Sequence, residues 1–410
     1  MQAGEGNRRL DDRARGPEHL HRLSRSSPGE LLDESGLAQP RVSLEQERGT
    51  AVGQLGAEGV EQRQLGATTD DLRRQHPHSF PSLYVAPPDN LSTRDRCLSD
   101  RPRLTLRLSA AVPLDARTTE GDLMTLTEHE VAEIERANGA GLRPVMFIHG
   151  LWLLSSSWDR WRGVFEEAGF TTIAPGWPDD PETVAEARQT PEVFAKKMVQ
   201  QVTDHYLEAA AALQQEPAVV GHSFGGLVAQ KVAGEGVAAA TVAIDPAPFQ
   251  GVLPIPADAL KSAFPVVGNP ANTRRAVTLT FEQFTFGWAN ALEEAEAHEL
   301  YDTFHVPAAG LPIFQAVTAN LNPFSETKVD TKNPDRGPLL IISGERDHTV
   351  PYAIAHSAYK IQAKHNEAIT EFVELPNRGH SLTIDHGWRE VATAALEFLA
   401  RAGVAPASGT

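Results

Sequence analysis

Short apolar runs rich in β-branched residues recur along the chain from residue 124 onward, and stretches with helical apolar spacing separate most of them. The runs cover residues 145–149, 171–174, 218–221, 240–244, 339–343 and 370–374. A short strand that is apolar throughout is buried on both faces, and strands that alternate with helices form a parallel sheet covered on both sides. The pattern therefore predicts an α/β fold, a doubly wound, mostly parallel sheet with six visible strands. The clearest helical patterns lie at 191–213, 227–233, 352–364 and 388–399.

One interval, between Asp245 and Leu339, breaks this rhythm. It is too long for a plain crossover between two strands. It holds eight of the 16 phenylalanines of the chain, together with Trp288 and Tyr301. Helical patterns are found in it at 256–264, 280–288 and 289–304. We expect a helical cap insertion at about residues 247–337, over the carboxyl edge of the sheet where open α/β folds bind ligands.

The first 123 residues differ from the rest in composition. They contain 17 Arg and no Lys, and no sustained helical or strand period except a possible strand at 104–112. Such a segment has little apolar surface to bury, and we expect it to be largely disordered. Arg-rich, Lys-free sequence is also what GC-rich DNA gives when it is translated outside a gene. Met124 is therefore a candidate natural start, with residues 1–123 as an annotation extension before a domain at 124–410, and an intact mass of the native protein would decide.

A capping box follows Met124 directly. Thr127 and Glu130 have the spacing that opens a helix, and Asn138–Gly139 is expected to end it.

Charge and composition exclude several classes of partner. The net charge of −17 argues against a nucleic-acid partner and against docking on an anionic membrane. No run of 18 apolar residues and no signal-peptide core occurs, so we expect a cytoplasmic protein. Cys97 is the only cysteine, which excludes an intrachain disulfide and a cysteine-rich metal site. No phosphate-binding glycine loop, dinucleotide fingerprint or zinc motif is found, so we expect no cofactor and no metal.

The strongest chemical signal is the sequence GHSFGG at residues 221–226. An apolar strand precedes it and a helical pattern follows it, as in the strand–turn–helix that exposes a nucleophilic serine. Gly221 and Gly225 are required because a side chain would collide with the neighbouring backbone in so tight a turn. Ser223 is therefore the candidate nucleophile.

Together with two further motifs, this sequence resembles the α/β-hydrolase superfamily, in particular its esterase and lysophospholipase-like members with a helical cap. The motifs are HGLW at 149–152, GHSFGG at 221–226, and GERDHTVP at 344–351 followed by NRGHS at 377–381. They stand in the order of the superfamily, and the resemblance covers about residues 144–403.

The resemblance implies the remaining catalytic machinery. The superfamily order of nucleophile, acid and histidine assigns Asp347 as the acid and His380 as the general base. It implies an oxyanion hole made of the backbone N–H groups of Leu151 and Phe224.

Three side chains are candidates for substrate contact in the same cleft. They are Trp152, His222 and Trp288.

Two alternatives for the site remain open. Asp245 also ends a strand, and some hydrolases draw their acid from that position. A metal site built from His380, Asp385 and His386 is conceivable, but the spacing fits no helix-face pair of ligands.

The expected activity is hydrolysis of a small to medium carboxylic ester through an acyl-enzyme. The aromatic-rich interval favours an apolar cleft and a small-molecule ester substrate. A carbon–carbon bond hydrolase and a cofactor-free perhydrolase use the same triad, and a hydrolase-fold small-molecule receptor with little turnover is an alternative of another class. The sequence does not indicate the oligomeric state.

Overall fold

The computed structural model of the chain describes residues 126–404. Its main sheet has six strands in the order β2-β1-β3-β4-β7-β8, and every neighbouring pair is parallel. The strands are β1 (Pro144–Ile148), β2 (Thr171–Ile173), β3 (Ala218–His222), β4 (Ala240–Ile244), β7 (Leu339–Gly344) and β8 (Thr370–Leu375). All six predicted strands are confirmed, and so is the α/β class.

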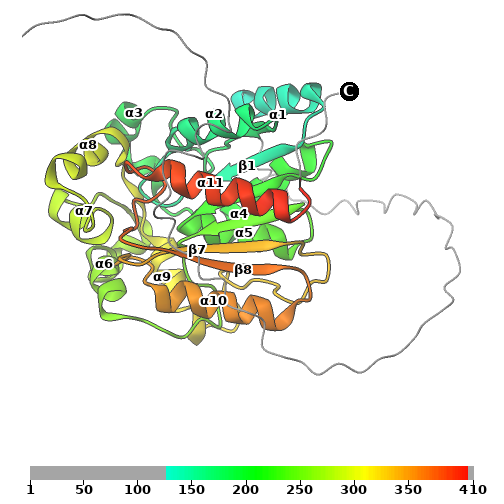
Figure 1. Cartoon of the computed structure of the whole chain (residues 1–410). Coiled ribbons are helices and arrows are strands. Elements are labelled where there is room, and N and C mark those ends of the chain that lie inside the picture. The colour runs from blue at the N-terminus through cyan, green and yellow to red at the C-terminus, as the bar shows by residue number, and fades with distance from the viewer. Residues whose placement is uncertain (1–125, 405–410) are drawn as a thin grey trace, which may run out of the picture. The chain divides into compact units, whose positions relative to one another are not determined.

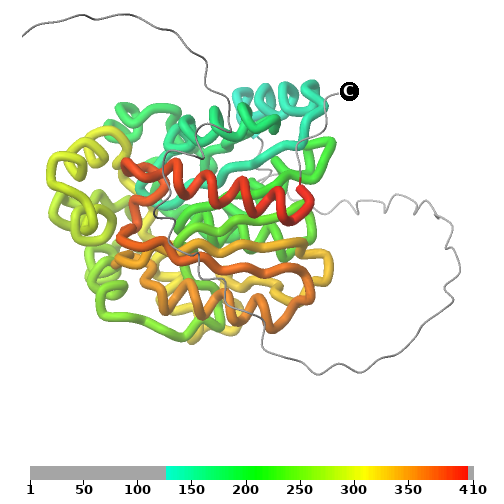
Figure 2. The backbone as a smooth tube through the Cα atoms, in the orientation of Figure 1, coloured from blue at the N-terminus to red at the C-terminus, as the bar shows by residue number. Residues whose placement is uncertain are grey.

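Helices cover both faces of this sheet (Figure 1). Successive strand residues point to opposite faces, so that Met146 and Ile148 of β1 join one core cluster while Val145 and Phe147 join the other. The first cluster packs under α1 (Glu128–Ala140), α4 (Val199–Ala212), α5 (Phe224–Gly234) and α10 (Tyr352–His365), and the second under α2 (Asp159–Glu167) and α11 (Trp388–Arg401). In the tube of Figure 2, the C-terminal helix α11 (red) runs across the front of the described chain. The sheet is therefore doubly wound, as the apolar strands predict.

Most helix boundaries follow the sequence patterns, but the helix predicted at 289–304 begins only at Glu294, and a second one differs more. The helix predicted at 191–213 is divided into two elements. The short 3-10 turn η3 covers Pro191–Phe194, and α4 begins only at Val199. Lys196 between them has a left-handed φ of 67°, and Lys197 turns inward to pair with Asp180. Apolar spacing does not reveal this break because a buried ion pair, not an apolar contact, interrupts the helix.

The capping box at Thr127 is confirmed. The Thr127 side chain accepts from the Glu130 N–H, and the Glu130 carboxylate accepts from the Thr127 N–H at 2.8 Å. The helix that it opens, α1, ends at Ala140 with Gly141 as its C-cap, slightly later than predicted.

Between β4 and β7 the chain forms a long helical segment, residues 245–338, which we call the insertion. Its elements are α6 (Ala257–Val267), η4 (Pro270–Arg274), β5 (Ala276–Val277), α7 (Phe281–Gly287), α8 (Glu294–Phe304), β6 (Ala308–Ala309), α9 (Leu311–Val317) and η5 (Ala319–Leu321), with β5 and β6 antiparallel. Figure 1 shows α6 to α9 gathered at one end of the sheet. Its role as a cap over a binding site stays a prediction.

Short elements complete the described chain, namely η2 (Ser155–Trp158) and α3 (Val184–Gln189). Within residues 126–404, no helix combines the length and the apolar character that crossing a membrane requires. The predicted disorder of residues 1–123 and the possible strand at 104–112 lie outside the described residues.

Candidate active site

Ser223 occupies the turn that joins β3 to α5. Its backbone has φ 58° and ψ −121°, a region that residues other than glycine rarely adopt. The Ser223 N–H donates to the carbonyl of Ile244 at the end of β4, and the Ser223 carbonyl accepts from the Ala247 N–H, both at 2.9 Å. These bonds to the neighbouring strand hold the strained turn, and such stored strain is typical of functional sites.

The two glycines around Ser223 lie where no side chain fits. A Cβ at Gly221 would lie 2.1 Å from the carbonyl oxygen of Gly225, and a Cβ at Gly225 would lie 2.1 Å from that of Ile148. Both partners are backbone atoms that cannot move aside. A side chain at either position would therefore collide with neighbouring backbone, as the sequence predicts.

Three of the predicted site residues form one hydrogen-bonded chain, and all three are buried. His380 Nε2 lies 3.0 Å from Ser223 Oγ, and His380 Nδ1 lies 2.6 Å from Asp347 Oδ2. The other carboxylate oxygen of Asp347 accepts from the N–H groups of Thr349 and Val350, at 2.6 and 2.8 Å. Asp347 thus holds the imidazole with its Nδ1 proton toward the acid and its Nε2 toward the serine.

The rival acid, Asp245, lies beside this chain. Its Oδ1 accepts from the Gly344 N–H at 2.8 Å, whereas its Oδ2 lies 4.0 Å from His380 Nδ1 and has no hydrogen-bond partner outside the contact with Asp347. Burial, followed by the nearby charge of Asp347, raises the pKa of Asp245 well above its ordinary value. Of the two carboxyl groups, Asp347 therefore makes the short bond to His380, and the raised pKa of Asp245 favours its protonated form.

Aromatic rings enclose the imidazole of His380. The ring centroid of Trp288 lies 4.6 Å from that of His380 in an edge arrangement, and that of His222 lies at 4.7 Å. His222 Nε2 lies 3.0 Å from the His380 carbonyl. Complete burial, followed by the charge of His380, lowers the pKa of His222 well below its ordinary value, so this ring is neutral and its Nε2–H donates to that carbonyl.

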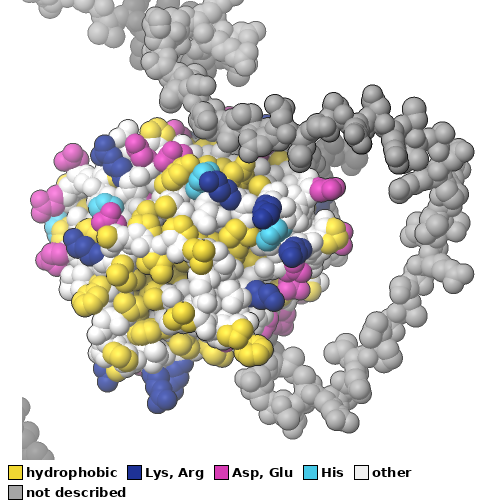
Figure 3. Space-filling view, turned by 90° about the horizontal axis from the view of Figure 1, so that it is seen from below, with side chains coloured by type: hydrophobic (Ala, Val, Ile, Leu, Met, Phe, Trp, Pro, Cys, Tyr) yellow, Lys and Arg dark blue, Asp and Glu magenta, His cyan; other side chains and the backbone are white. Residues whose placement is uncertain are grey.

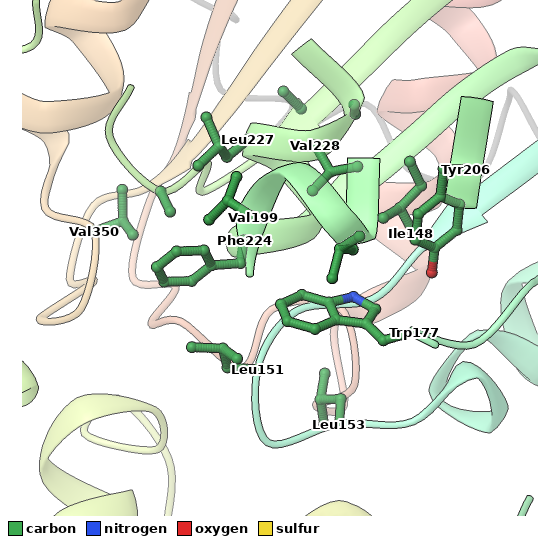
Figure 4. Packing of buried hydrophobic residues seen from close by; sticks show 14 of the residues in the cluster. Ile148, Leu151, Leu153, Trp177, Val199, Tyr206, Phe224, Leu227, Val228 and Val350 are labelled. Atoms are coloured by element: carbon green, nitrogen blue, oxygen red, sulfur yellow. The ribbon is translucent and has the colours of Figure 1, made fainter. Parts of the chain in front are cut away.

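The predicted oxyanion donors come from two separate segments that meet beside Ser223. Figure 4 shows Phe224 at the start of α5 with Leu151 nearby. Within residues 126–404, neither the Leu151 N–H nor the Phe224 N–H donates to a protein acceptor. Two unpaired backbone donors next to a serine hydroxyl are what an oxyanion hole requires.

A side-chain cluster that the sequence did not reveal supports the Leu151 loop. His149 Nδ1 lies 2.9 Å from the carbonyl of Gly150, the peptide group whose N–H belongs to Leu151. His149 Nε2 lies 3.2 Å from Asp180 Oδ2, and Asp180 in turn pairs with the buried Lys197. No motif marks Asp180 or Lys197, because the pair forms only when the segment before α4 folds against the loop.

The match to a family model agrees with this geometry. A model described as the alpha/beta hydrolase family matches residues 145–395, more than half of the chain. The chain belongs to this family. Comparison with curated proteins gives no match.

Solved structures similar to this hydrolase include three bacterial or archaeal enzymes. A monoacylglycerol lipase from Paleococcus ferrophilus is 19% identical, with a TM-score of 0.45, over 63% of this chain and 94% of its own. An extracellular alpha/beta-hydrolase from a Paenibacillus species is 20% identical, with a TM-score of 0.47, over 62% and 98%. A pyrethroid hydrolase from Sphingobium faniae is 17% identical, with a TM-score of 0.44, over 62% and 96%.

A pocket of about 810 Å³, part of it open to solvent, lies next to Ser223 in this hydrolase. None of its 19 lining residues is charged, and 13 of them belong to the insertion. Trp152 lines the pocket with a left-handed φ of 64°, and its Nε1–H donates to the Val277 carbonyl in β5 at 3.0 Å. His222 and Trp288, the other two candidates for substrate contact, are not among the lining residues and surround His380 instead.

The polar side chains of the pocket are already paired with protein groups. Ser262 Oγ lies 2.8 Å from Thr349 Oγ1, whose hydroxyl donates to the Gly287 carbonyl at 2.7 Å. Asn320 accepts from the Gly251 N–H and donates to a carbonyl of the same segment. Apart from the Ser223 end, the pocket of the hydrolase is therefore an apolar surface.

The alternative metal group does not form around His380. Asp385 pairs with Arg378, and the exposed His386 contacts Glu296 instead. Among the described residues, the histidines and carboxylates close enough to share an ion are His222, Asp245 and His380. This group lies inside the hydrogen-bonded site, where His380 Nδ1 already contacts Asp347.

Proposed function

We propose that this chain is a serine hydrolase that cleaves a carboxylic ester with an apolar acyl group through an acyl-enzyme. The observation that carries the proposal is the hydrogen-bonded chain Ser223–His380–Asp347 at the apolar pocket. Membership of the alpha/beta hydrolase family supports an enzyme that hydrolyses ester bonds.

The first half of the reaction uses His380 as a base. Ser223 Oγ attacks the ester carbonyl while its proton moves to His380 Nε2, 3.0 Å away. Asp347 keeps the Nδ1 proton in place and stabilises the imidazolium that forms. The N–H groups of Leu151 and Phe224 receive the oxyanion, and the imidazolium then protonates the departing alkoxide.

The second half repeats these roles with water. His380 takes a proton from a water molecule that attacks the acyl-serine, and Ser223 leaves with the proton returned by Nε2. The acid product is released. The aromatic rings of Trp288 and His222 hold the imidazole in one orientation through both halves.

The lining of the pocket favours an apolar acyl group as the part of the substrate that binds there. A polar or charged acyl group would lose its hydration and find no free hydrogen-bond partner among the paired side chains of the pocket. An alkyl or aryl chain only gains from burial.

Turnover of p-nitrophenyl esters from acetate to decanoate, compared between the parent and Ser223→Ala, tests the proposal. Loss of the nucleophile should lower kcat by a factor on the order of 10⁶. The acyl length with the highest kcat/KM would then report the length of the pocket.

Two results would contradict the proposal. Equal activity of Ser223→Ala would remove Ser223 as the nucleophile. A folded parent that turns over no ester, but cleaves a β-diketone or supports peroxide-dependent bromination, would move the chemistry to one of the alternatives that share this triad.

A further inference from the structure

Large apolar side chains are exposed mainly on one part of the molecule. Between residues 126 and 404, 11 large apolar side chains are exposed, and seven of them belong to the insertion. All seven lie on segments that line the pocket or directly adjoin it, and we call them the apolar rim: Leu253, Ile255, Leu260, Phe264, Val317, Leu321 and Phe324. Phe324 is 88% exposed and Leu321 is 86% exposed, so neither packs against the fold.

The rim is continuous with the pocket. Ile255, Leu260 and Val317 are exposed and also line the pocket, so one apolar surface leads from the outside toward Ser223. The helices α6 and α9, which carry Leu260 and Val317, pack against each other. Figure 3 shows yellow apolar side chains gathered on one face of the molecule. A contiguous exposed apolar surface at the mouth of a pocket is typical of a binding interface.

The charge of the rim differs from that of the whole chain. The chain carries a net charge of −17, yet residues 251–275 have a single acid, Asp258, against Lys261, Arg274 and Arg275. Residues 307–325 have no charged side chain at all. Arg274 and Arg275 are exposed and pair with no carboxylate among the described residues. An apolar surface flanked by unpaired cations and nearly free of carboxylates complements a lipid surface with anionic headgroups.

We infer that the apolar rim docks on a lipid surface and that an acyl chain passes from the lipid directly into the pocket. This inference rests on the proposed function and makes the substrate class a long-chain acyl ester held in a lipid aggregate. It revises the expectation from the net charge that the protein avoids membranes, because the local charge at the rim is positive.

Vesicle binding tests the docking without any turnover. The full chain with Ser223→Ala is sedimented with vesicles of phosphatidylcholine, with and without phosphatidylglycerol. We expect it to bind, and more tightly when phosphatidylglycerol is present. Adding Leu321→Ser and Phe324→Ser, which lie outside the pocket lining, should lower the ratio of bound to free protein by about tenfold or more.

A matched control keeps the number of removed apolar side chains equal. Val131 and Ile369 are also exposed but lie outside the insertion, on α1 and just before β8. Val131→Ser with Ile369→Ser should leave vesicle binding unchanged, and thermal denaturation shows that both double variants fold.

Kinetics separate the docking from the chemistry. With Ser223 intact, Leu321→Ser with Phe324→Ser should keep the parent kcat/KM on dissolved p-nitrophenyl butyrate. Its activity on a long-chain ester embedded in vesicles should fall about as much as its binding. If binding follows this pattern but the parent turns over no ester, the docking stands and the proposed function falls.

Three results would overturn the docking. The parent staying in the supernatant at every lipid composition is one, and equal losses in the rim and control variants is another. The third is a dimer of the parent in sedimentation velocity that the rim variant does not form, while the parent binds no vesicles. That result would assign the rim to a second copy of this chain.

Discussion

The imidazole of His380 faces two buried carboxyl groups, and their hydrogen bonds give them different tasks. Asp347 receives three donors, His380 Nδ1 at 2.6 Å and two backbone N–H groups. Asp245 receives one donor, from Gly344, and its pKa is raised by burial and by Asp347. Asp347 is placed to hold the imidazole, whereas the raised pKa of Asp245 favours a neutral neighbour.

Neutral isosteres distinguish these tasks. Asp347→Asn should lower kcat/KM about 10⁴-fold, because an amide holds the wrong tautomer of His380. Asp245→Asn should change kcat/KM by less than about tenfold, because the raised pKa of Asp245 already favours its uncharged form. The measurement is ester turnover at neutral pH by both variants, and the opposite ranking would make Asp245 the acid.

The pH dependence of stability gives a second test of Asp245. Its pKa is raised in the folded chain above the ordinary value of 3.8, so the folded state retains a proton that the unfolded state releases as the pH rises. Asp245 therefore lowers the free energy of unfolding progressively above a pH of about 4. Asp245→Asn does not titrate and should raise the melting temperature at neutral pH by a few degrees, with the gain lost below a pH of about 4. A variant that is less stable than the parent at neutral pH would contradict this assignment.

Among single residues, the sequence predicts those site residues that lie within short motifs. Ser223, His380 and Asp347 each stand in a short local pattern, and the fold brings them within hydrogen-bond distance. The supporting pair Asp180 and Lys197 could not be predicted, because neither residue has a local pattern and their contact depends on how two distant loops meet.

At the scale of elements, the strand–turn–helix around Ser223 depends on close backbone packing. Gly225→Ala places a Cβ 2.1 Å from the Ile148 carbonyl oxygen and should lower the free energy of unfolding by about 3 kcal/mol or more. Gly139→Ala, in α1 with no atom within 4 Å of the added Cβ, should raise it by about 0.5–1 kcal/mol. Urea denaturation of both variants is the measurement, and similar effects of the two would show that the turn tolerates rearrangement.

The insertion contributes most of the pocket wall, and one of its helices allows the pocket to be shortened. Ala316 of α9 is half-buried and lines the pocket, so Ala316→Trp should lower kcat/KM on the decanoate ester by at least about tenfold and spare the acetate. Thr318→Trp, two residues on and exposed, is the control. An unchanged preference for acyl length in Ala316→Trp would mean that the acyl group does not occupy this pocket.

The helices and strands could be predicted where burial of apolar side chains alone determines them. The four central strands β1, β3, β4 and β7 are buried along their whole length, and their largely apolar sequences leave a plain signal. The break before α4 and the small β5–β6 pair depend on ion pairing and on two-residue contacts, and neither leaves an apolar period.

At the scale of the whole molecule, the net charge of the chain does not predict the local charge of the surface around the pocket. The value of −17 describes the chain, but residues 251–275, which include the pocket-lining helix α6, hold three cations and one acid. The exposure of Leu321 and Phe324 could not be predicted from the sequence either. Aromatic and aliphatic residues in the insertion are expected to be buried until their packing is known.

Covalent labelling tests the central claim most directly, since it reports the nucleophile itself. A fluorophosphonate should add one adduct per folded chain, peptide mapping should locate it on Ser223, and His380→Ala should slow the labelling sharply because the hydroxyl loses its base. Labelling of the parent elsewhere, or undiminished labelling of Ser223→Ala, would contradict the account.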